Sequence, residues 1–259
     1  MSHTSALARS KAMGRHLFGA AALLLGVAGL ALHAQLVSNW RLPGGDVFIF
    51  VTSIAQIAGG AAMQFGKSQR LGAVILGAVY LLFSLTFVRD VFKHPGVFAS
   101  WGNVFYQLSL VTGAVVAYGM SSPSAPNART ISRAAVMLLG VCNLSFAVEQ
   151  VEFLARTAGL VPKWVPPNGM FWAIATTVAF GLAGISLLIG YKSLLASRLL
   201  GLMLALFGVA IWIPALIADP KMHSNWSEGL ETFAIAGAAW IVAEFLRRDR
   251  GVRRAAHEA

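Results

Sequence analysis

The sequence predicts an all-α, polytopic transmembrane protein in which eight helices form two parallel four-helix repeats. Hydrophobic residues make up 57% of the 259-residue chain and charged residues only 12%, whereas soluble domains carry about 25% charged residues. The mean hydropathy of +0.70 agrees with lipid as the surrounding solvent. The single cysteine, Cys142, lies in an apolar stretch, which excludes an intramolecular disulfide and a cysteine-based metal site.

Long apolar segments give the second observation. A helix needs about 20 apolar residues to cross a hydrocarbon core of about 30 Å. Eight windows meet this requirement: 16–36, 47–65, 71–92, 101–120, 133–155, 169–190, 198–217 and 228–246. Backbone groups in lipid must be hydrogen-bonded within the segment, so we expect each window to be a helix. The first window resembles a signal peptide, but it is long enough to span and lacks a clean cleavage site, so we expect it to be retained.

An internal repeat is the third observation. Six residues recur 124 positions later, with Trp40, Pro43, Gly45, Thr52, Gly60 and Gly66 matched by Trp164, Pro167, Gly169, Thr176, Gly184 and Gly190. Pro95 and Trp101 recur as Pro220 and Trp226, at an offset of 125. Four helices per copy is an even number, so both copies enter the membrane from the same side and the repeats are parallel. The predicted units are residues 1–120, a linker at 121–132, residues 133–246 and a basic tail at 247–259.

Positive charge predicts the orientation of these units. Basic residues gather on the cytoplasmic side of short-loop membrane proteins. With the amino terminus inside, 14 of the 20 lysines and arginines fall on the inner side: Arg9, Lys11, Arg15, Lys67, Arg70, Arg129, Arg133, Lys192, Arg198, Arg247, Arg248, Arg250, Arg253 and Arg254. We therefore expect both termini in the cytoplasm. The basic tail is expected to meet anionic lipid head groups, and nucleic acid is not expected as a partner.

Acidic residues gather at the opposite, outer level. Glu149 and Glu152 end the fifth window, and Glu228 and Glu231 begin the eighth, each pair at the i, i+3 spacing that places two side chains on one helix face. His33 lies at the same level. Ionisable groups at the membrane point to a site, either a quinone or other ligand pocket or a metal centre. The alternative is a solvated rim, in which the acids pair with basic neighbours: Arg89, Lys93, Arg156 and Lys221.

Several residues inside the windows have expected structural roles. Gln56, Gln64 and Asn143 are candidates for hydrogen bonds between helices, and Trp212-Ile213-Pro214 predicts a kink. Glu244 can neutralise Arg247 or Arg248 near the inner end. Small residues predict close helix approach in the second window and its counterpart: Gly59, Gly60, Ala61 and Ala62, then Gly181, Ala183 and Gly184.

Familiar catalytic motifs do not occur. The chain has no P-loop, no Gly-x-Ser-x-Gly, no His-Glu-x-x-His and no haem-attachment motif, so enzymes of those classes are unsupported. The Glu-x-x-His pattern of di-iron bundles is also missing, and no metal ligand is predicted.

The second copy contains a recognisable series of segments, namely 160–167 (LVPKWVPP), Phe171-Trp172 and 198–202 (RLLGL), and then Asp219-Pro220 with Trp226 and Glu231. In these residues it resembles the DoxX family of small bacterial membrane proteins. The whole chain is similar to tandem DoxX-like proteins, which have two fused four-helix units. This resemblance implies a transmembrane fold in the bacterial inner membrane, and related DoxD-type subunits are associated with thiosulfate:quinone oxidoreduction. The chain departs from the family's histidine pattern, with Gln150 at one of the matching places and Trp212 or Ile213 at the other.

Two functions follow as expectations. The first is an accessory or structural inner-membrane protein without chemistry or a cofactor of its own, whose partners are the lipid bilayer and a further membrane or periplasmic subunit. The alternative is the membrane subunit of a quinone-linked oxidoreductase, with quinone bound at the periplasmic side by His33, Glu149, Glu152, Glu228 and Glu231. A transporter is least supported, because the two copies lack matching Gly/Pro-broken segments at mid-membrane.

Overall fold

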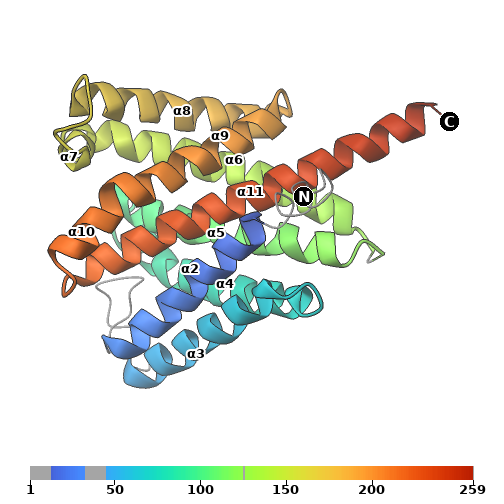
Figure 1. Cartoon of the computed structure of the whole chain (residues 1–259), viewed down its shortest axis with the longest axis horizontal. Coiled ribbons are helices and arrows are strands. Elements are labelled where there is room, and N and C mark those ends of the chain that lie inside the picture. Colours follow the sequence, from blue (N-terminus) through green and yellow to red (C-terminus); the bar gives the residue numbers. More distant parts are fainter. Residues whose placement is uncertain (1–12, 33–44, 125, 259) are drawn as a thin grey trace, which may run out of the picture.

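The computed structural model describes residues 13–32, 45–124 and 126–258, and within these ranges the chain is helical, without a strand. The helices are α2 (Met13–Ala31), α3 (Gly45–Gln64), α4 (Gln69–Lys93), α5 (Phe98–Ser121), α6 (Ala128–Glu152), α7 (Leu154–Leu160), α8 (Gly169–Ile189), α9 (Ser193–Phe207), the π-helical turn η1 (Gly208–Trp212), α10 (Ile213–Ala218) and α11 (His223–Glu258). Figure 1 shows the long helices lying side by side with their axes roughly aligned.

Eight of these helical segments are long and apolar enough to cross a membrane. Each overlaps one predicted window, with α9, η1 and α10 together forming the seventh. Large apolar side chains cover the outside of the bundle, among them Leu182 and Ile189 on α8, which are 63% and 68% exposed. An apolar surface of this kind is stable in lipid and not in water. The chain therefore has the architecture of a multi-pass membrane protein.

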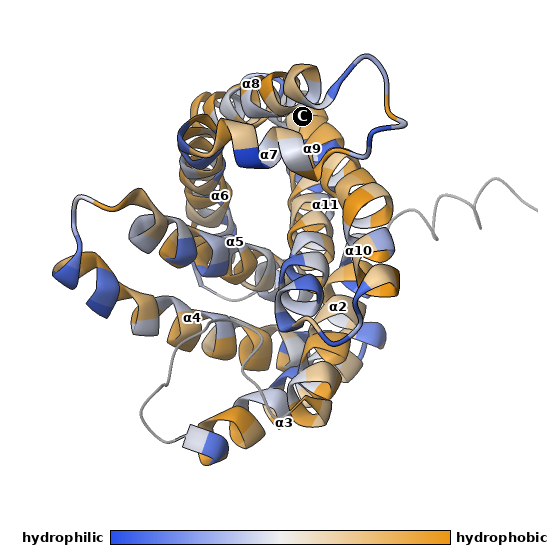
Figure 2. Ribbon diagram, turned by 90° about the vertical axis from the view of Figure 1, so that its left-hand side faces the viewer, coloured by the Kyte–Doolittle hydropathy of each residue, from blue (hydrophilic) through white to orange (hydrophobic). Residues whose placement is uncertain are grey.

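The helices form a closed ring, in the order α2, α3, α4, α5, α6, α8, α9 and α11, with α11 returning to pack on α2. The ring is visible end-on in Figure 2, where α5 and α11 also meet across its middle. Consequently the outer helices of each predicted repeat pack on the other half, α2 against α11 and α5 against α6. The α5–α11 contact divides the interior into two parts.

Glycine allows the closest of these contacts. A Cβ atom on Gly237 of α11 would lie 2.5 Å from the backbone nitrogen of Phe18 on α2, and one on Gly113 of α5 would lie 2.5 Å from Cβ of Ala238. In α3, Gly60 packs equally closely on α2, as the sequence predicted for this segment, whereas Gly181 of α8 has no neighbour within 4 Å of a Cβ position. Close approach increases dispersion contacts between helices, which drive association in lipid.

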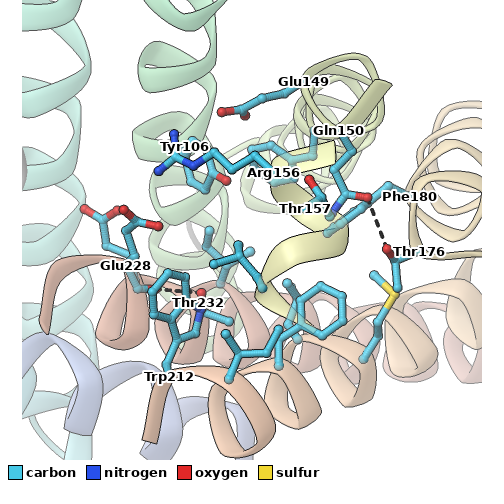
Figure 3. A pocket seen from close by; sticks show the side chains of 18 of the residues that line it. Tyr106, Glu149, Gln150, Arg156, Thr157, Thr176, Phe180, Trp212, Glu228 and Thr232 are labelled. Atoms are coloured by element: carbon cyan, nitrogen blue, oxygen red, sulfur yellow. Dashed lines mark hydrogen bonds between the residues drawn. The ribbon is translucent and has the colours of Figure 1, made fainter. Parts of the chain in front are cut away.

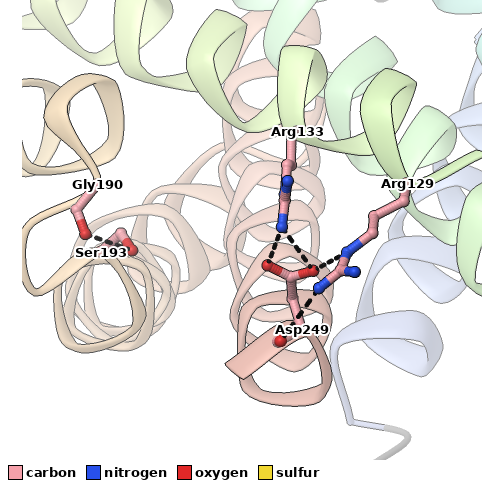
Figure 4. Close-up of polar contacts among 5 residues, drawn as sticks. All are labelled: Arg129, Arg133, Gly190, Ser193 and Asp249. Carbon is pink, nitrogen blue, oxygen red and sulfur yellow. Dashed lines mark hydrogen bonds and ion pairs between the residues drawn. The ribbon is translucent and has the colours of Figure 1, made fainter. Parts of the chain in front are cut away.

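Charged residues fasten α11 to α6 at the end of the bundle that holds the α5–α6 connection. Arg133 donates to both carboxylate oxygens of Asp249, at 3.2 and 2.9 Å, and Arg129 forms a second ion pair with the same carboxylate (Figure 4). On α11 itself, Glu244 pairs with Arg247 and Arg248, which confirms the predicted neutralisation.

The helix bounds differ from the predicted windows by a few residues. α6 begins at Ala128, inside the predicted linker, and Arg129 and Arg133 near its start pair with Asp249. α6 ends at Glu152, three residues before the predicted end, and the short α7 follows. The basic segment after residue 246 continues α11 as helix.

The residues that were expected to join helices or to bend them have different roles in the structure. Gln64 does join two helices, with Oε1 2.9 Å from Nδ1 of His16, whereas Nδ2 of Asn143 donates to Leu139 of its own helix. The expected irregularity before Pro214 is the π-helical turn η1. A proline has no backbone N–H and cannot donate a hydrogen bond to the preceding turn, which accounts for the break in the α-helical pattern there.

Replacing Gly237 by valine should destabilise the bundle, because the new side chain would collide with the backbone of α2. We expect a loss of about 1–3 kcal/mol, the usual cost of overpacking. Gly181→Val adds the same side chain on a surface with open space and is the matched control. Unfolding by heat or denaturing detergent, followed by circular dichroism, measures both. Equal effects of the two substitutions would contradict the α2–α11 packing.

Candidate functional site

A large cavity lies within the ring, mainly in its second half. It is lined by α5, α6, α8, α9, η1 and α11, with α7, residues 161–165 and the start of α3 at one end, and its volume is about 1310 Å³. The cavity is open at the end of the bundle that holds the α4–α5, α6–α8 and α10–α11 connections. The close-up in Figure 3 shows polar side chains in one part of the cavity and apolar side chains in another.

Two carboxylates enter the cavity from the first turns of α11. Glu228 and Glu231 both line it, as their i, i+3 spacing predicted. Oε1 of Glu231 accepts a hydrogen bond of 3.0 Å from Nε2 of Gln107 on α5. Gln107 is only 2% exposed, and its own Oε1 has no hydrogen-bond partner. This corner of the cavity therefore combines a half-buried carboxylate with a buried, unsatisfied amide oxygen.

A third carboxylate, Glu149, reaches the cavity from the last turn of α6. Gly102 of α5 leaves room for it, since a Cβ atom there would lie 3.2 Å from Oε2 of Glu149. That oxygen is buried and has no hydrogen-bond partner. A buried acceptor without a partner is costly, which marks the position as one that a bound group can complete.

One guanidinium faces these acids. The main chain turns after Phe153, and the short helix α7 carries Arg156 over the end of the cavity. In Figure 3 its side chain extends toward Tyr106 and the region of Glu149. Among the described residues, no ion pair within 4.0 Å joins Arg156 to Glu149, Glu228 or Glu231. The acids of the cavity are thus not neutralised by direct pairing.

The deeper wall is apolar and largely aromatic. Tyr106, Phe146 and Phe180 stack in sequence from α5 through α6 to α8, with ring centroids 4.8 and 5.6 Å apart. Phe207 and Trp212 continue the wall on α9 and η1. A π-helical turn within a helix commonly occurs at a functional site, and here it forms part of the cavity wall.

The cavity also extends between α8 and α9. Leu199, Leu202 and Leu206 on α9 line it and are 54%, 49% and 57% exposed. Ala175 and Ala179 of α8, which also line it, have small side chains that leave space. Because α8 and α9 are the most loosely packed neighbours in the ring, we infer that the cavity opens between them toward the membrane, in addition to its polar end.

The five predicted site residues have different places. Glu149, Glu228 and Glu231 come together around the cavity. Glu152 is exposed and does not line it. His33 lies outside the residues that the structure describes. Within the described part of the chain, no three His, Cys, Asp or Glu side chains are grouped so that they can hold a metal ion.

Some residues that line the cavity were not predicted from the sequence. Gln107 was not singled out, and Gln150 was noted only for its place in the family's histidine pattern, although a glutamine within an apolar span is the same signal that indicated Gln56 and Gln64. Gln150 accepts hydrogen bonds from Thr176 and Thr177, at 3.2 and 3.0 Å, and so joins α6 to α8 beside the cavity. Tyr106 gives no such signal, since a tyrosine is common at membrane interfaces.

Comparison with protein-family models, with curated proteins and with solved structures gave no match. The site is therefore interpreted from its own geometry.

Replacing Glu149 by methionine should stabilise the protein, because it removes a buried oxygen that has no partner. We expect a gain of about 1–3 kcal/mol, the usual cost of an unsatisfied buried group. Glu152→Met, three residues along the same helix but exposed, should change the free energy of unfolding little. Thermal unfolding in one detergent compares the two. A destabilised Glu149→Met with an unchanged Glu152→Met would show that the Glu149 carboxylate is satisfied.

Proposed function

We propose that the protein binds a membrane-dissolved amphipathic molecule in this cavity. The observation that carries the proposal is the combination of a polar end, an aromatic wall and a lateral opening in one cavity. Ligand sites are typically concave and mostly apolar, with a few converging polar groups that fix orientation. A purely accessory role requires no such cavity, so the geometry favours binding.

The polar end suits the head group of the ligand. Tyr106 and Arg156 can donate hydrogen bonds, whereas Glu149, Glu228 and Glu231 can accept them. The apolar part of the molecule would lie against Phe180 and the side chains of α9. Entry between α8 and α9 would let it pass from the bilayer into the cavity without crossing water.

A quinone-linked role is the redox form of this proposal. The donors Tyr106 and Arg156 favour it, because a quinone presents two carbonyl oxygens that accept hydrogen bonds. In that form the electron-transferring partner is a separate membrane or periplasmic subunit.

We also propose that the chain forms two parallel repeats and lies in a bacterial inner membrane, with both termini in the cytoplasm. Matching hydrogen bonds support the repeat. Nε1 of Trp101 donates to Pro95 at 3.0 Å, and Nε1 of Trp226 donates to Pro220 at 2.9 Å. A second pair of hydrogen bonds is related by the 124-residue offset of the repeat. Oγ1 of Thr52 donates to the carbonyl oxygen of Phe48, at 2.7 Å, and Oγ1 of Thr176 donates to that of Trp172, at 2.8 Å.

Filling the cavity tests the binding proposal. The protein in lipid nanodiscs is titrated with three probes: decylubiquinone, which is neutral, tetraphenylphosphonium, which is cationic, and tetraphenylborate, which is anionic. At least one probe should bind saturably, above its partition into empty nanodiscs. Ala179→Trp places an indole in the cavity and should weaken that binding at least tenfold.

Val178→Trp is the matched control. Val178 neighbours Ala179 on α8, is 53% exposed and does not line the cavity, so its substitution should leave binding unchanged. Saturable binding of none of the probes, or binding that survives Ala179→Trp, would overturn the proposed function.

A further inference from the structure

The charges that face the cavity are strongly unequal. Asp46, Glu149, Glu228 and Glu231 contribute four carboxylates, against the one guanidinium of Arg156 and the imidazole of His223. Asp46 is exposed at the start of α3, whereas the three glutamates lie farther inside. Like charges in a region of low dielectric repel one another strongly, so these carboxylates are stabilised by bound positive charge or by taking up protons.

The unsatisfied atoms of the cavity point to the same kind of group. Oε1 of Gln107 and Oε2 of Glu149 are both buried acceptors without a partner, and they come from the neighbouring helices α5 and α6. Gln107 is 2% exposed, and its Nε2 donates to Oε1 of Glu231. Two orphaned acceptors call for a ligand that supplies positive charge or hydrogen-bond donors.

The aromatic wall agrees with a cation of organic type. Tyr106, Phe146, Phe180 and Trp212 line the cavity next to the acids. The face of an aromatic ring is negative and attracts a cation within about 6 Å, most strongly where water is excluded. An inorganic cation would need several coordinating side chains around it, and among the described residues no three His, Cys, Asp or Glu side chains are grouped to hold a metal ion.

We propose that the ligand of this cavity is a lipophilic organic cation, whose charge lies among Glu149, Glu228 and Glu231 and whose apolar groups pack on the aromatic wall. This inference rests on the proposed function and narrows it to one class of molecule. The lateral opening between α8 and α9 suits it, because such cations accumulate in membranes through their apolar groups. The volume of about 1310 Å³ accommodates a molecule with several rings.

Two probes of nearly equal size and shape but opposite charge test the sign of the site. Equilibrium binding to the protein in nanodiscs is measured with tetraphenylphosphonium and tetraphenylborate, and with decyltrimethylammonium as a second cation of different shape. At least one cation should bind saturably and at least tenfold more tightly than tetraphenylborate and decylubiquinone. Empty nanodiscs give the background from partition.

Substitutions then assign the selectivity to the cavity. Glu149→Gln should weaken cation binding about tenfold, and Glu152→Gln on the exposed side of α6 should not. Arg156→Gln removes the opposing positive charge and should tighten cation binding several-fold, an effect that misfolding does not produce.

Each other outcome is decisive. If tetraphenylborate or decylubiquinone binds in the cavity as tightly as both cations, the cation inference is wrong and the binding function stands. The same holds if Glu149→Gln and Arg156→Gln leave cation binding unchanged. If no probe binds, both the inference and the proposed function are overturned.

Discussion

The packing of α11 against α2 and α5 is the contact on which the other features depend. Gly14 and Gly237 bring the backbones of α2 and α11 together, and Gly113 lets α5 approach α11 at Ala238. In lipid the hydrophobic effect does not drive helices together, so contact of this closeness has to supply the attraction. It closes the ring and holds α11 near the centre. The glutamates at the start of α11 are carried inward as a result.

The cavity exists because the two parts of the interior are filled differently. On the side of α2, α3 and α4, large side chains such as Phe18, Tyr80 and Leu76 are fully buried and occupy the space. On the side of α8, small residues such as Ala175 and Ala179 face the interior. Protein interiors are normally close-packed, so a volume of this size lined by unpaired acids is a departure that structural needs do not explain.

Hydropathy located the membrane helices well, because a span is defined by its own composition. Their ends were less predictable. Residues 128–132 are polar enough to be taken for a linker, yet they begin α6, and Arg129 and Arg133 pair with Asp249 on a distant helix. These ion pairs join segments far apart in the sequence, so no local pattern predicts them. The short α7 has too few residues for a periodic pattern.

The candidate site was predictable to a similar degree. The i, i+3 spacing placed Glu228 and Glu231 on one face, and both face the cavity. The same spacing failed for Glu149 and Glu152. Three residues turn a helix by about 300°, which leaves the two side chains about 60° apart. At the edge of a cavity that angle is enough to put one inside and one outside. Gln107 could not be assigned to the site without knowing that α5 meets α11.

The opening between α8 and α9 has a thermodynamic consequence. A molecule that enters there is drawn from the bilayer, so the concentration that matters is its amount per lipid and not its amount per volume of water. Two molecules with equal affinity inside the protein would differ in apparent affinity by the ratio of their partition coefficients. Adding lipid at constant protein would dilute both equally. Under the proposed function, selectivity is therefore a property of the membrane and the cavity together.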